Sequence, residues 1–436
     1  MSSRLRSLVK VIIPRSLFRW IEPYGHLLEA ILMNVRYGFP ARGMHVIGVT
    51  GTNGKTTTTF MIHRILVEAG YDVALMSTVA YGVGRDITPQ AAHMTTMSSP
   101  ELLRRIRDFK RQGATWLVLE TTSHALAQHR VWGVPYEIAV MTNITHEHLD
   151  YHGTFAKYLK AKVKLFKIAN RHGHRFGVVN ADDEHAAEFA RVIRRSTSYG
   201  VDSGDLRASD IRLRPDGSDY KVVIDNKLLD FSCNIPGEFN VYNSLAAIAV
   251  ARELGLNYGL MSNGLKALAG VEGRMDTIDE GQPFSVVVDF AHTPDSFERL
   301  LGDLRRATPG KLVVLFGSAG RRDESKRAIQ GEIAGKYADE VVITEEDDRD
   351  IDGNQIRAQI AEGAARSGKA KDRDMFLITD RADAIRFAVT RVNEKGDALV
   401  LLGKGHEKTI ERADGEHPWD EAAEVRTALA SRSATE

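Results

Sequence analysis

The feature that most constrains the fold is a glycine-rich loop between an apolar strand and a helix. Val46–Thr50 is strand-like, Gly51–Thr56 reads GTNGKT, and a helical stretch continues to Glu68. Glycines let backbone N–H groups close on phosphate oxygens, and the N-terminus of the following helix adds a favourable potential. A strand that runs through such a loop into a helix begins an α/β unit, which has a mostly parallel sheet.

The residue types of this loop fit a nucleotide polyphosphate with magnesium. Lys55 can reach the outer phosphates, and the Thr56 hydroxyl can ligate Mg²⁺. The general motif requires a glycine where this chain has Val49, so the match is to the GTxGKT variant. The alternative, a chance Gly-Lys-Thr in an unrelated loop, conflicts with the strand–loop–helix context. The predicted nucleotide site consists of Gly51, Thr52, Asn53, Gly54, Lys55, Thr56 and Thr57.

Strand-like runs alternate with helical stretches from His45 onward, which predicts an α/β fold with largely parallel sheets. Short alternating strands between about Thr197 and Cys233, with an Asp216-Gly217 turn, predict an antiparallel excursion attached to the first sheet. The other strand-like runs are Trp116–Glu120, Glu137–Asn143, Val286–Phe290, Leu312–Gly317, Val341–Thr344 and Leu399–Gly403.

Length and pattern together predict the domain organisation. A chain of 436 residues exceeds one ordinary core. After a predicted helix at Val241–Leu254 the pattern breaks at Gly270–Gly273, and a new strand begins near Phe284. We therefore assign residues 1–45 to a basic, apolar helical extension. Residues 46–270 form a P-loop-type central ATP-binding domain, and residues 271–436 form a Rossmann-like C-terminal domain.

Composition narrows the partners and the compartment. The chain has 58 Lys and Arg against 58 Asp and Glu, so no overall field attracts nucleic acid. Its single cysteine, Cys233, cannot form an internal disulfide and suits a reducing cytoplasm. We expect small-molecule substrates and a monomer.

The first 45 residues carry seven basic side chains against Glu22 and Glu29, mixed with apolar residues. No apolar run approaches the roughly 18 residues of a membrane-spanning helix. Lys10 and Pro14 interrupt the only candidate signal-peptide core, and no small-residue cleavage site follows. Two roles stay open: packing on the body, or contact of residues 1–42 with an anionic membrane surface.

Two further strand ends are expected beside the phosphate loop. Glu120 ends one strand, and the next strand ends at Thr142-Asn143 and leads to the segment 146–153, HEHLDYHG. Ligand groups gather at the carboxyl ends of strands in open α/β sheets. Glu120 and His148, with Thr56, could therefore hold a divalent ion against ATP oxygens. For Glu120 alone, an ordinary strand-end salt bridge is the alternative.

A zinc alternative exists for the same segment. His146-x-His148-x-Asp150 resembles the dinuclear-zinc motif of metallo-β-lactamase-fold hydrolases. That motif requires a histidine immediately after the aspartate, where this chain has Tyr151. It also leaves the phosphate loop unexplained, so the magnesium interpretation is preferred.

A series of ordered motifs resembles the Mur ligase family. They are GVTGTNGKTTT, ETTSHALAQHR, TNITHEHLDYHG, GEFNVYNSLAA, GRMD, VVDFAHTPDS, GSAGRRDESKR and LLGKGHE. The DFAHTP segment at 289–294 and the GKGHE segment at 403–407 are similar to the MurE branch. The resemblance spans roughly residues 45–410, most of the chain.

The resemblance implies a ligase reaction in peptidoglycan synthesis. MurE-like enzymes use ATP to phosphorylate the D-glutamate side-chain carboxylate of UDP-MurNAc-L-Ala-D-Glu, and the amine of a diamino acid then attacks the acyl phosphate. It further implies that Asn243, Arg274 and Asp289 contact the nucleotide, and that Lys162 is a carbamylated lysine that bridges toward magnesium. The acceptor positions would be Thr95, Thr96, Thr122, Gln128 and Arg130. The amino-acid positions would be Arg322, Asp347, Arg349, Gly403 and Glu407. The implied catalytic set is Lys55, Glu120, His148 and Lys162.

The sequence departs from the family pattern in two places. MurE enzymes have an N-terminal uridine-binding domain before the phosphate loop, and only 45 residues precede the loop strand here, so we expect no such domain. Diaminopimelate-adding enzymes carry Asp-Asn-Pro-Arg, where this chain reads TEEDDR at 344–349. Arg349 survives at the matching place, and we favour meso-diaminopimelate over lysine. The alternative is a solvated acidic loop with Arg349 as its internal counterion.

Two other functions stay open. One is a related amino-acid ligase of the folylpolyglutamate- or cyanophycin-synthetase type, which would not be expected to have the GKGHE segment. The other is a non-catalytic, nucleotide-binding partner of a cell-wall enzyme, against which the retention of Lys55, Glu120, His148 and Lys162 argues.

Overall fold

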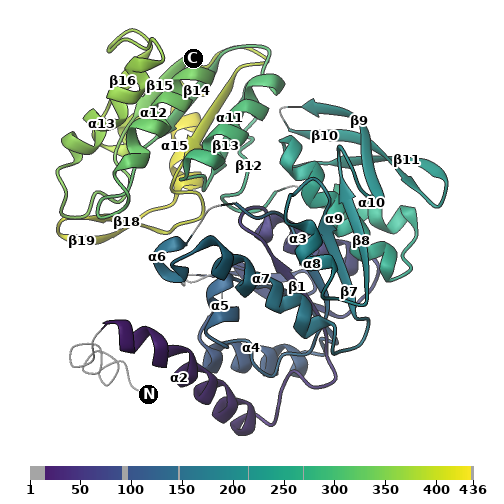
Figure 1. Ribbon diagram of the computed structural model, residues 1–436. Coiled ribbons are helices and arrows are strands. Elements are labelled where there is room, and N and C mark those ends of the chain that lie inside the picture. Colours follow the sequence, from purple (N-terminus) through teal and green to yellow (C-terminus); the bar gives the residue numbers. More distant parts are fainter. Residues whose placement is uncertain (1–14, 91–96, 146–147, 215, 269, 434–436) are drawn as a thin grey trace. The chain divides into compact units, whose positions relative to one another are not determined.

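The chain was analysed as a computed structural model, which describes residues 15–90, 97–145, 148–214, 216–268 and 270–433 (Figure 1). It divides into two compact units. The first comprises the chain up to residue 209 with 222–229 and 242–267, and the second comprises 210–221, 230–241 and the chain from 268 onward. The domain boundaries that the sequence predicts, after residues 45 and 270, remain a proposal.

The larger sheet is mixed and has the strand order β11-β10-β9-β8-β7-β6-β1-β5-β2-β3-β4, of which β1 to β8 lie in the first unit. The strand β1 (His45–Thr50) lies in parallel between β5 (Trp116–Glu120) and β6 (Tyr136–Met141). The remaining strands are β2 (Val73–Met76), β3 (Ala80–Val83), β4 (Asp86–Pro89), β7 (Phe176–Asn180), β8 (Arg195–Gly200), β9 (Leu206–Arg214), β10 (Gly217–Ile224) and β11 (Lys227–Cys233). The largely parallel sheet that the sequence predicts is confirmed.

The predicted excursion begins later in the chain than expected. β8 continues the parallel order by pairing with β7, so Thr197 belongs to the main sheet. The polar sequence of β8, RSTSYG, lacks the apolar character of the other central strands, which explains why the sequence places it in the excursion. β10 and β11 are joined by Asp225 and Asn226, which both have positive φ (50° and 62°), as two-residue hairpin turns require.

Helices cover the strands of the first unit. Its helices are α2 (Arg15–Arg36), α3 (Lys55–Glu68), α4 (Ser99–Arg111), α5 (Ser123–Ala127), α6 (Leu149–His152), α7 (Phe155–Ala169), α8 (Ala186–Ala190), α9 (Glu238–Glu253) and α10 (Tyr258–Lys266). The apolar spacing of α4 shows why such segments are helical: Leu102, Ile106 and Phe109 recur on one face and are buried in the core. α7 begins at Thr154, whose hydroxyl accepts a hydrogen bond from the Lys157 amide.

The second unit has its own six-stranded sheet with the order β12-β13-β17-β14-β15-β16. All pairs are parallel except that of β12 with β13. The strands are β12 (Asp276–Thr277), β13 (Ser285–Asp289), β14 (Leu312–Phe316), β15 (Glu340–Ile343), β16 (Met375–Leu377) and β17 (Ala398–Leu402). Nearly all the side chains of β13, β14, β15 and β17 are buried, as expected for a parallel sheet with both faces covered.

Helices and one hairpin complete this unit. They are α11 (Pro294–Ala307), α12 (Ser325–Tyr337), α13 (Gly353–Arg366), α14 (Arg381–Val389), α15 (Glu421–Ser433) and the hairpin of β18 (Thr409–Arg412) with β19 (Gly415–Pro418). α11 begins with a capping box between Thr293 and Ser296, with Pro294 as its first residue. Among the described helices, none is both long and apolar enough to cross a membrane.

Candidate functional site

The phosphate loop joins the carboxyl end of β1 to the N-terminus of α3. Gly54 adopts a left-handed φ of 78° as the N-cap of α3. A Cβ at Gly54 would collide with the Asn243 side chain, and one at Gly51 would collide with Thr142. The loop is therefore packed so closely that only glycine fits at both positions, and it leads directly into the N-terminus of a 14-residue helix, where anions bind favourably.

Side chains from β6 hold the loop in shape. The Asn53 amide donates to Asn143 Oδ1 over 2.9 Å, and the Thr142 hydroxyl donates to the Asn53 carbonyl over 2.6 Å. The Thr52 hydroxyl lies 2.9 Å from the Tyr158 hydroxyl of α7. Lys55 donates over 2.6 Å to the Thr52 carbonyl, so its ammonium lies over the loop itself.

Glu120 is fixed beside the loop at the end of β5. The Thr56 hydroxyl donates to its Oε2 over 3.0 Å. The Thr78 amide donates to Oε2 over 2.9 Å, and the Thr78 hydroxyl donates to Oε1 over 3.0 Å. Glu120 is buried. The two proposed metal ligands Thr56 and Glu120 are thus brought together, and Thr78 is a partner that the sequence interpretation did not identify.

Lys162 reaches the same loop from α7. Its side chain is buried, its ammonium donates to the Gly51 carbonyl, and it lies 4.6 Å from the centre of the Tyr158 ring. His148 is exposed, has a positive φ of 55°, and its ring lies 4.7 Å from that of His124. His124 follows Glu120 by four residues, so His148 lies near the segment that leaves β5.

Three of the proposed acceptor residues flank the short helix α5, which follows Glu120. Thr122 caps α5 by accepting from the Ala125 amide over 3.2 Å. Arg130 Nε donates to Gln128 Oε1 over 2.6 Å. Burial raises the pKa of Tyr151, opposed by a hydrogen bond to Gln128. The proposed acceptor residues Thr95 and Thr96 lie outside the described residues.

Asn243 lies in the first unit, on α9, directly against the phosphate loop. Its Oδ1 accepts from the Thr58 hydroxyl over 3.1 Å and lies next to Gly54. In the second unit, Asp289 ends β13 and accepts from the amides of Met275 and Ala291, both over 2.7 Å. Burial raises the pKa of Asp289, and the nearby Arg274 guanidinium opposes that shift.

The loops after β15 and β17 carry four of the five proposed amino-acid residues. Lys404 is fully buried and donates to Asp347 Oδ1 over 2.8 Å and to Glu407 Oε2 over 2.7 Å. Burial by itself would lower the pKa of Lys404. The carboxylates of Glu407 and Asp347 together raise this pKa by more than burial lowers it, so the net shift is upward. Gly403 has φ 103°, and a Cβ there would meet the buried Glu346 carboxylate, 2.5 Å away. Asp347, Gly403 and Glu407 therefore lie around one buried lysine that the sequence interpretation did not assign.

Arg349 lies beside this cluster but already has a carboxylate partner. Its Nε donates to Glu411 Oε2 over 2.6 Å, and its Nη1 donates to the Gly320 carbonyl over 2.5 Å. Glu411 belongs to β18, and its amide donates to Asp347 over 2.9 Å. Arg322 is exposed in the loop between β14 and α12, near Lys326. The alternative in which Arg349 is the counterion of the acidic loop stays open, because its guanidinium also lies 3.9 Å from Asp347 Oδ2 within that loop.

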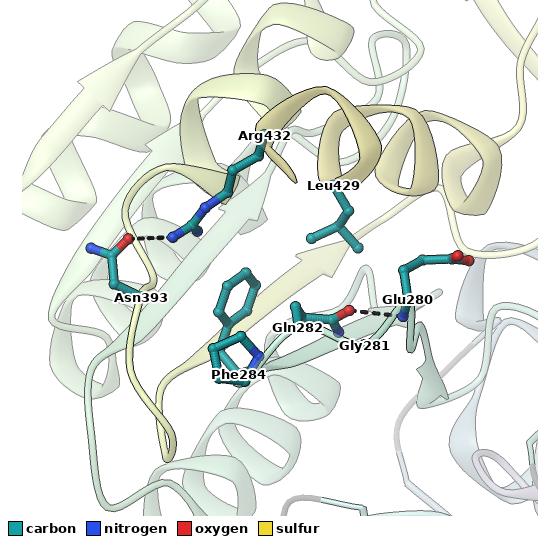
Figure 2. Close-up of a pocket in the computed structure, with 8 residues that line it drawn as sticks. Glu280, Gly281, Gln282, Phe284, Asn393, Leu429 and Arg432 are labelled. Carbon is teal, nitrogen blue, oxygen red and sulfur yellow. Dashed lines mark hydrogen bonds between the residues drawn. The ribbon is translucent and has the colours of Figure 1, made fainter. Parts of the chain in front are cut away.

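A cavity in the second unit lies away from these residues. Its lining includes Phe284, Asn393, Leu429 and Arg432, with Arg432 donating over 2.7 Å to Asn393 Oδ1 (Figure 2). Phe284 directly precedes β13, whereas Asp289 ends that strand. Ligands of open α/β sheets bind at the carboxyl ends of strands, so this cavity is not the candidate active site.

The residues at the loop fit ATP and magnesium. Two glycines without room for a Cβ, the free end of α3 and Lys55 match a polyphosphate. Thr56 and Glu120 offer a hydroxyl and a carboxylate, the oxygen ligands that Mg²⁺ prefers. Mg²⁺ commonly takes its remaining ligands from water and substrate phosphates, so one carboxylate and one hydroxyl suffice from the protein. Fold and site therefore define a P-loop enzyme of α/β class that acts on a nucleotide triphosphate.

Comparison with known proteins identifies the family. Residues 49–251 match the Mur ligase middle domain, and residues 273–405 match the Mur ligase glutamate ligase domain. A UDP-N-acetylmuramyl-tripeptide synthetase of Roseiflexus sp. (strain RS-1) is 41% identical over 94% of this chain and 83% of its own length. A UDP-N-acetylmuramoyl-L-alanyl-D-glutamate–2,6-diaminopimelate ligase of Geobacillus thermodenitrificans (strain NG80-2) is 37% identical over 94% of this chain and 84% of its own length.

A solved structure supports the same family. A structure of a UDP-N-acetylmuramoyl-L-alanyl-D-glutamate–2,6-diaminopimelate ligase superposes with a TM-score of 0.68 and 30% identity, covering 95% of this chain and 83% of that one. The chain belongs to the Mur ligase family. It is an amide-bond ligase that uses ATP and Mg²⁺. This identification rejects the zinc-hydrolase interpretation of His146, His148 and Asp150.

Proposed function

We propose that this ligase joins meso-diaminopimelate to the D-glutamate carboxylate of a muramoyl-L-Ala-D-Glu acceptor in cytoplasmic peptidoglycan precursor synthesis. The observation that carries the substrate class is the pocket after β15, where a buried lysine separates two carboxylates and an arginine lies beside them. A diamino acid with a distal carboxylate offers two ammonium groups and two carboxylates, which complement such a mixed pocket. The name of the Geobacillus relative, a 2,6-diaminopimelate ligase, supports the same amino acid, and the name of the Roseiflexus relative supports a muramyl-tripeptide product.

The first unit would activate the acceptor. A carboxylate that attacks a polyphosphate meets like-charge repulsion, so positive groups must supply much of the catalysis. Lys55 and the first amides of α3 would hold the phosphate oxygens, while Gln128 and Arg130 would orient the acceptor peptide. Thr56 and Glu120 would hold magnesium, which neutralises charge that builds on the phosphate oxygens. Glu120 is well suited to this role because Thr78 fixes both of its oxygens.

Lys162 would complete the magnesium site as a carbamate. A neutral, desolvated amine can capture CO₂ and become an anionic oxygen ligand. Its burial next to the Gly51 carbonyl and the Tyr158 ring supports this assignment, because it places the amine away from bulk water and next to the phosphate loop. His148 would serve the same metal region from the segment between β6 and α6.

The second unit would hold the amino acid. Glu407 and Gly403 would bind the distal ammonium group, and Arg349 and Arg322 would bind the distal carboxylate. Burial raises the pKa of Glu407, with Lys404 opposing that shift, so a bound ammonium would add the charge that keeps this carboxylate ionised. Asp289 and Arg274 would contact the nucleotide.

The test is a product and selectivity assay. The protein is incubated with ATP, muramoyl-peptide acceptors and a panel of amino acids, and the products are identified by mass. We then compare kcat/KM for meso-diaminopimelate and L-lysine in wild type and Arg349→Ala. Two charge-assisted bonds from arginine contribute about 1.5–3 kcal/mol each, so the variant should lose at least tenfold in kcat/KM for diaminopimelate. A wild type that prefers lysine, or a variant with unchanged selectivity, would refute the proposed amino acid.

A further inference from the structure

The outward face of α2 carries a row of exposed apolar side chains. Tyr24, Leu28, Leu32 and Val35 are 59%, 58%, 54% and 64% exposed. On an ideal helix with 100° per residue these four positions fall within an arc of about 80°. They therefore form one continuous stripe, and they are not scattered surface residues of the kind that needs no explanation.

The opposite side of α2 is firmly attached to the first unit. Ala30 and Asn34 are buried, and Asn34 Nδ2 donates over 2.9 Å to the Trp132 carbonyl. Trp132 is itself exposed, and its ring lies 6.4 Å from that of Phe39. The described residues include nine exposed large hydrophobic side chains, and five of them are these four and Trp132. Exposed apolar surface is thus concentrated on and beside one helix.

Basic side chains lie on α4, the helix that packs against α2. α2 packs along α4, as Figure 1 shows, and α4 has five basic residues against Glu101 and Asp108. Arg107 lies 4.7 Å from the ring of Tyr37, just after α2, and Lys110 donates to the Arg42 carbonyl over 2.5 Å. Three arginines, Arg104, Arg107 and Arg111, approach the single carboxylate of Asp108 within 3.8 Å.

The excess positive charge of this region is local. The chain as a whole has equal numbers of basic and acidic residues, whereas α4 has five basic residues against two acidic ones. We define the α2–α4 surface by its exposed or partly exposed members, which are Tyr24, Leu28, Leu32, Val35, Trp132, Arg104, Arg107, Lys110 and Arg111. An apolar stripe on one helix, with arginines on the helix packed against it, matches a surface that lies at the boundary between lipid headgroups and acyl chains. Tryptophan and tyrosine are favoured at the same depth.

A second copy of this chain fits the surface less well. A two-fold contact through α2 would place the arginines of α4 near those of the partner, and like charges at an interface oppose association. A lipid surface supplies both the apolar layer and the negative charge. We propose that the α2–α4 surface docks this ligase peripherally on an anionic lipid membrane, with α2 lying parallel to the membrane plane.

The test uses the full chain and vesicles of defined composition. Wild type, the double variant Leu28→Glu/Leu32→Glu and the control Leu228→Glu are mixed with phosphatidylcholine vesicles with and without 30% phosphatidylglycerol, on the order of what anionic membranes contain. Leu228 is 57% exposed on β11, so the control adds the same charge at an equally exposed apolar side chain outside the α2–α4 surface. Circular dichroism and ATP turnover confirm that the variants are folded.

We expect wild type and the Leu228 variant to float with the anionic vesicles, and the double variant to bind at least tenfold more weakly. Arg104→Gln/Arg111→Gln should weaken binding several-fold at low salt, with the difference shrinking as salt screens the charges. Wild type that stays in solution with anionic vesicles, or a double variant that floats equally well, would overturn the proposal. So would a wild-type dimer that the double variant converts to a monomer without any vesicle binding, since that result assigns the surface to a second copy.

Discussion

The substitution Glu411→Gln tests how the amino-acid pocket controls Arg349. Glu411 Oε2 lies 2.6 Å from Arg349 Nε, and the main chains of the two residues are joined by a further bond of 3.0 Å. The Glu411 carboxylate therefore occupies the guanidinium that the substrate's distal carboxylate would use. Glutamine keeps the size and the backbone bonds but removes the competing charge.

The size of the expected change in KM depends on how exposed the Arg349–Glu411 ion pair is. The side chains of Arg349 and Glu411 are 19% and 41% exposed, so solvent screens their attraction and the pair contributes about 0.2–1 kcal/mol. A substrate carboxylate must displace Glu411 and lose that amount of binding free energy. Removing the competitor should lower the KM for meso-diaminopimelate about 1.4- to 5-fold at saturating ATP and acceptor. L-Lysine has no distal carboxylate, so its KM should stay the same.

Initial rates of product formation with each amino acid give the two KM values. Glu416→Gln is the matched control, because Glu416 lies opposite Glu411 on the same hairpin and is exposed. Salt should reduce the effect, since the competition is between charges in a partly exposed site. An unchanged KM for diaminopimelate in Glu411→Gln, or an equal decrease for lysine, would show that Glu411 does not compete for the carboxylate.

Three other predictions concern the first unit. Lys162→Ala should abolish ligation with partial rescue by bicarbonate or a short carboxylic acid, whereas Lys160→Ala should keep wild-type rates; full activity of the Lys162 variant would contradict the carbamate assignment. Gly54→Ala should weaken ATP binding at least tenfold in calorimetry, because the new Cβ meets Asn243, while Gly70→Ala, with a similar φ of 81° but nothing within 4 Å, should not. Burial lowers the pKa of His63 from 6.5 to about 4. As the pH falls, His63 is protonated at a higher pH in the unfolded chain than in the folded one, so protonation favours the unfolded state. The free energy of unfolding should therefore fall as the pH drops from 6.5 toward 4, by about 2 kcal/mol at pH 5. Urea unfolding at pH 7.5 and pH 5 should show that His63→Gln loses this part of the pH dependence, and an unchanged dependence would exclude His63 as its source.

The strand-end part of the site could be predicted from the sequence because it depends on local order and sheet geometry. GTNGKT follows β1 and Glu120 ends β5, and these neighbouring parallel strands bring Thr56 and Glu120 within 3.0 Å. Thr78 follows β2, the next parallel strand, and was missed because no strand had been identified at Val73–Met76. The same strand-end rule would have found it once that short, four-residue strand was recognised.

The partners within the second unit could not be predicted in this way. Glu411 follows Arg349 by 62 residues and lies on a two-stranded hairpin outside the main sheet, so no strand order fixes their distance. Lys404 stands inside GKGHE, and its burial between Asp347 and Glu407 depends on the path of two loops. Ion pairs between loops follow from the complete fold, whereas strand-end positions follow from the alternation of strands and helices.

The hairpin that carries Glu411 is also tied to the core of the second unit through the acidic loop. Arg412, the next residue, donates to both oxygens of Glu345 over 2.6 and 2.9 Å. The Glu345 carbonyl in turn accepts from Arg381 over 3.0 Å, and Arg381 forms a fully buried pair with Glu421. Breaking a buried pair by removing one partner is strongly destabilising, so this chain of contacts holds the loop backbone in one place. Arg349 can therefore exchange Glu411 for a substrate carboxylate by side-chain rotation, without movement of the loop. This is why the substitution of a single carboxylate on the hairpin should change substrate affinity without changing the fold.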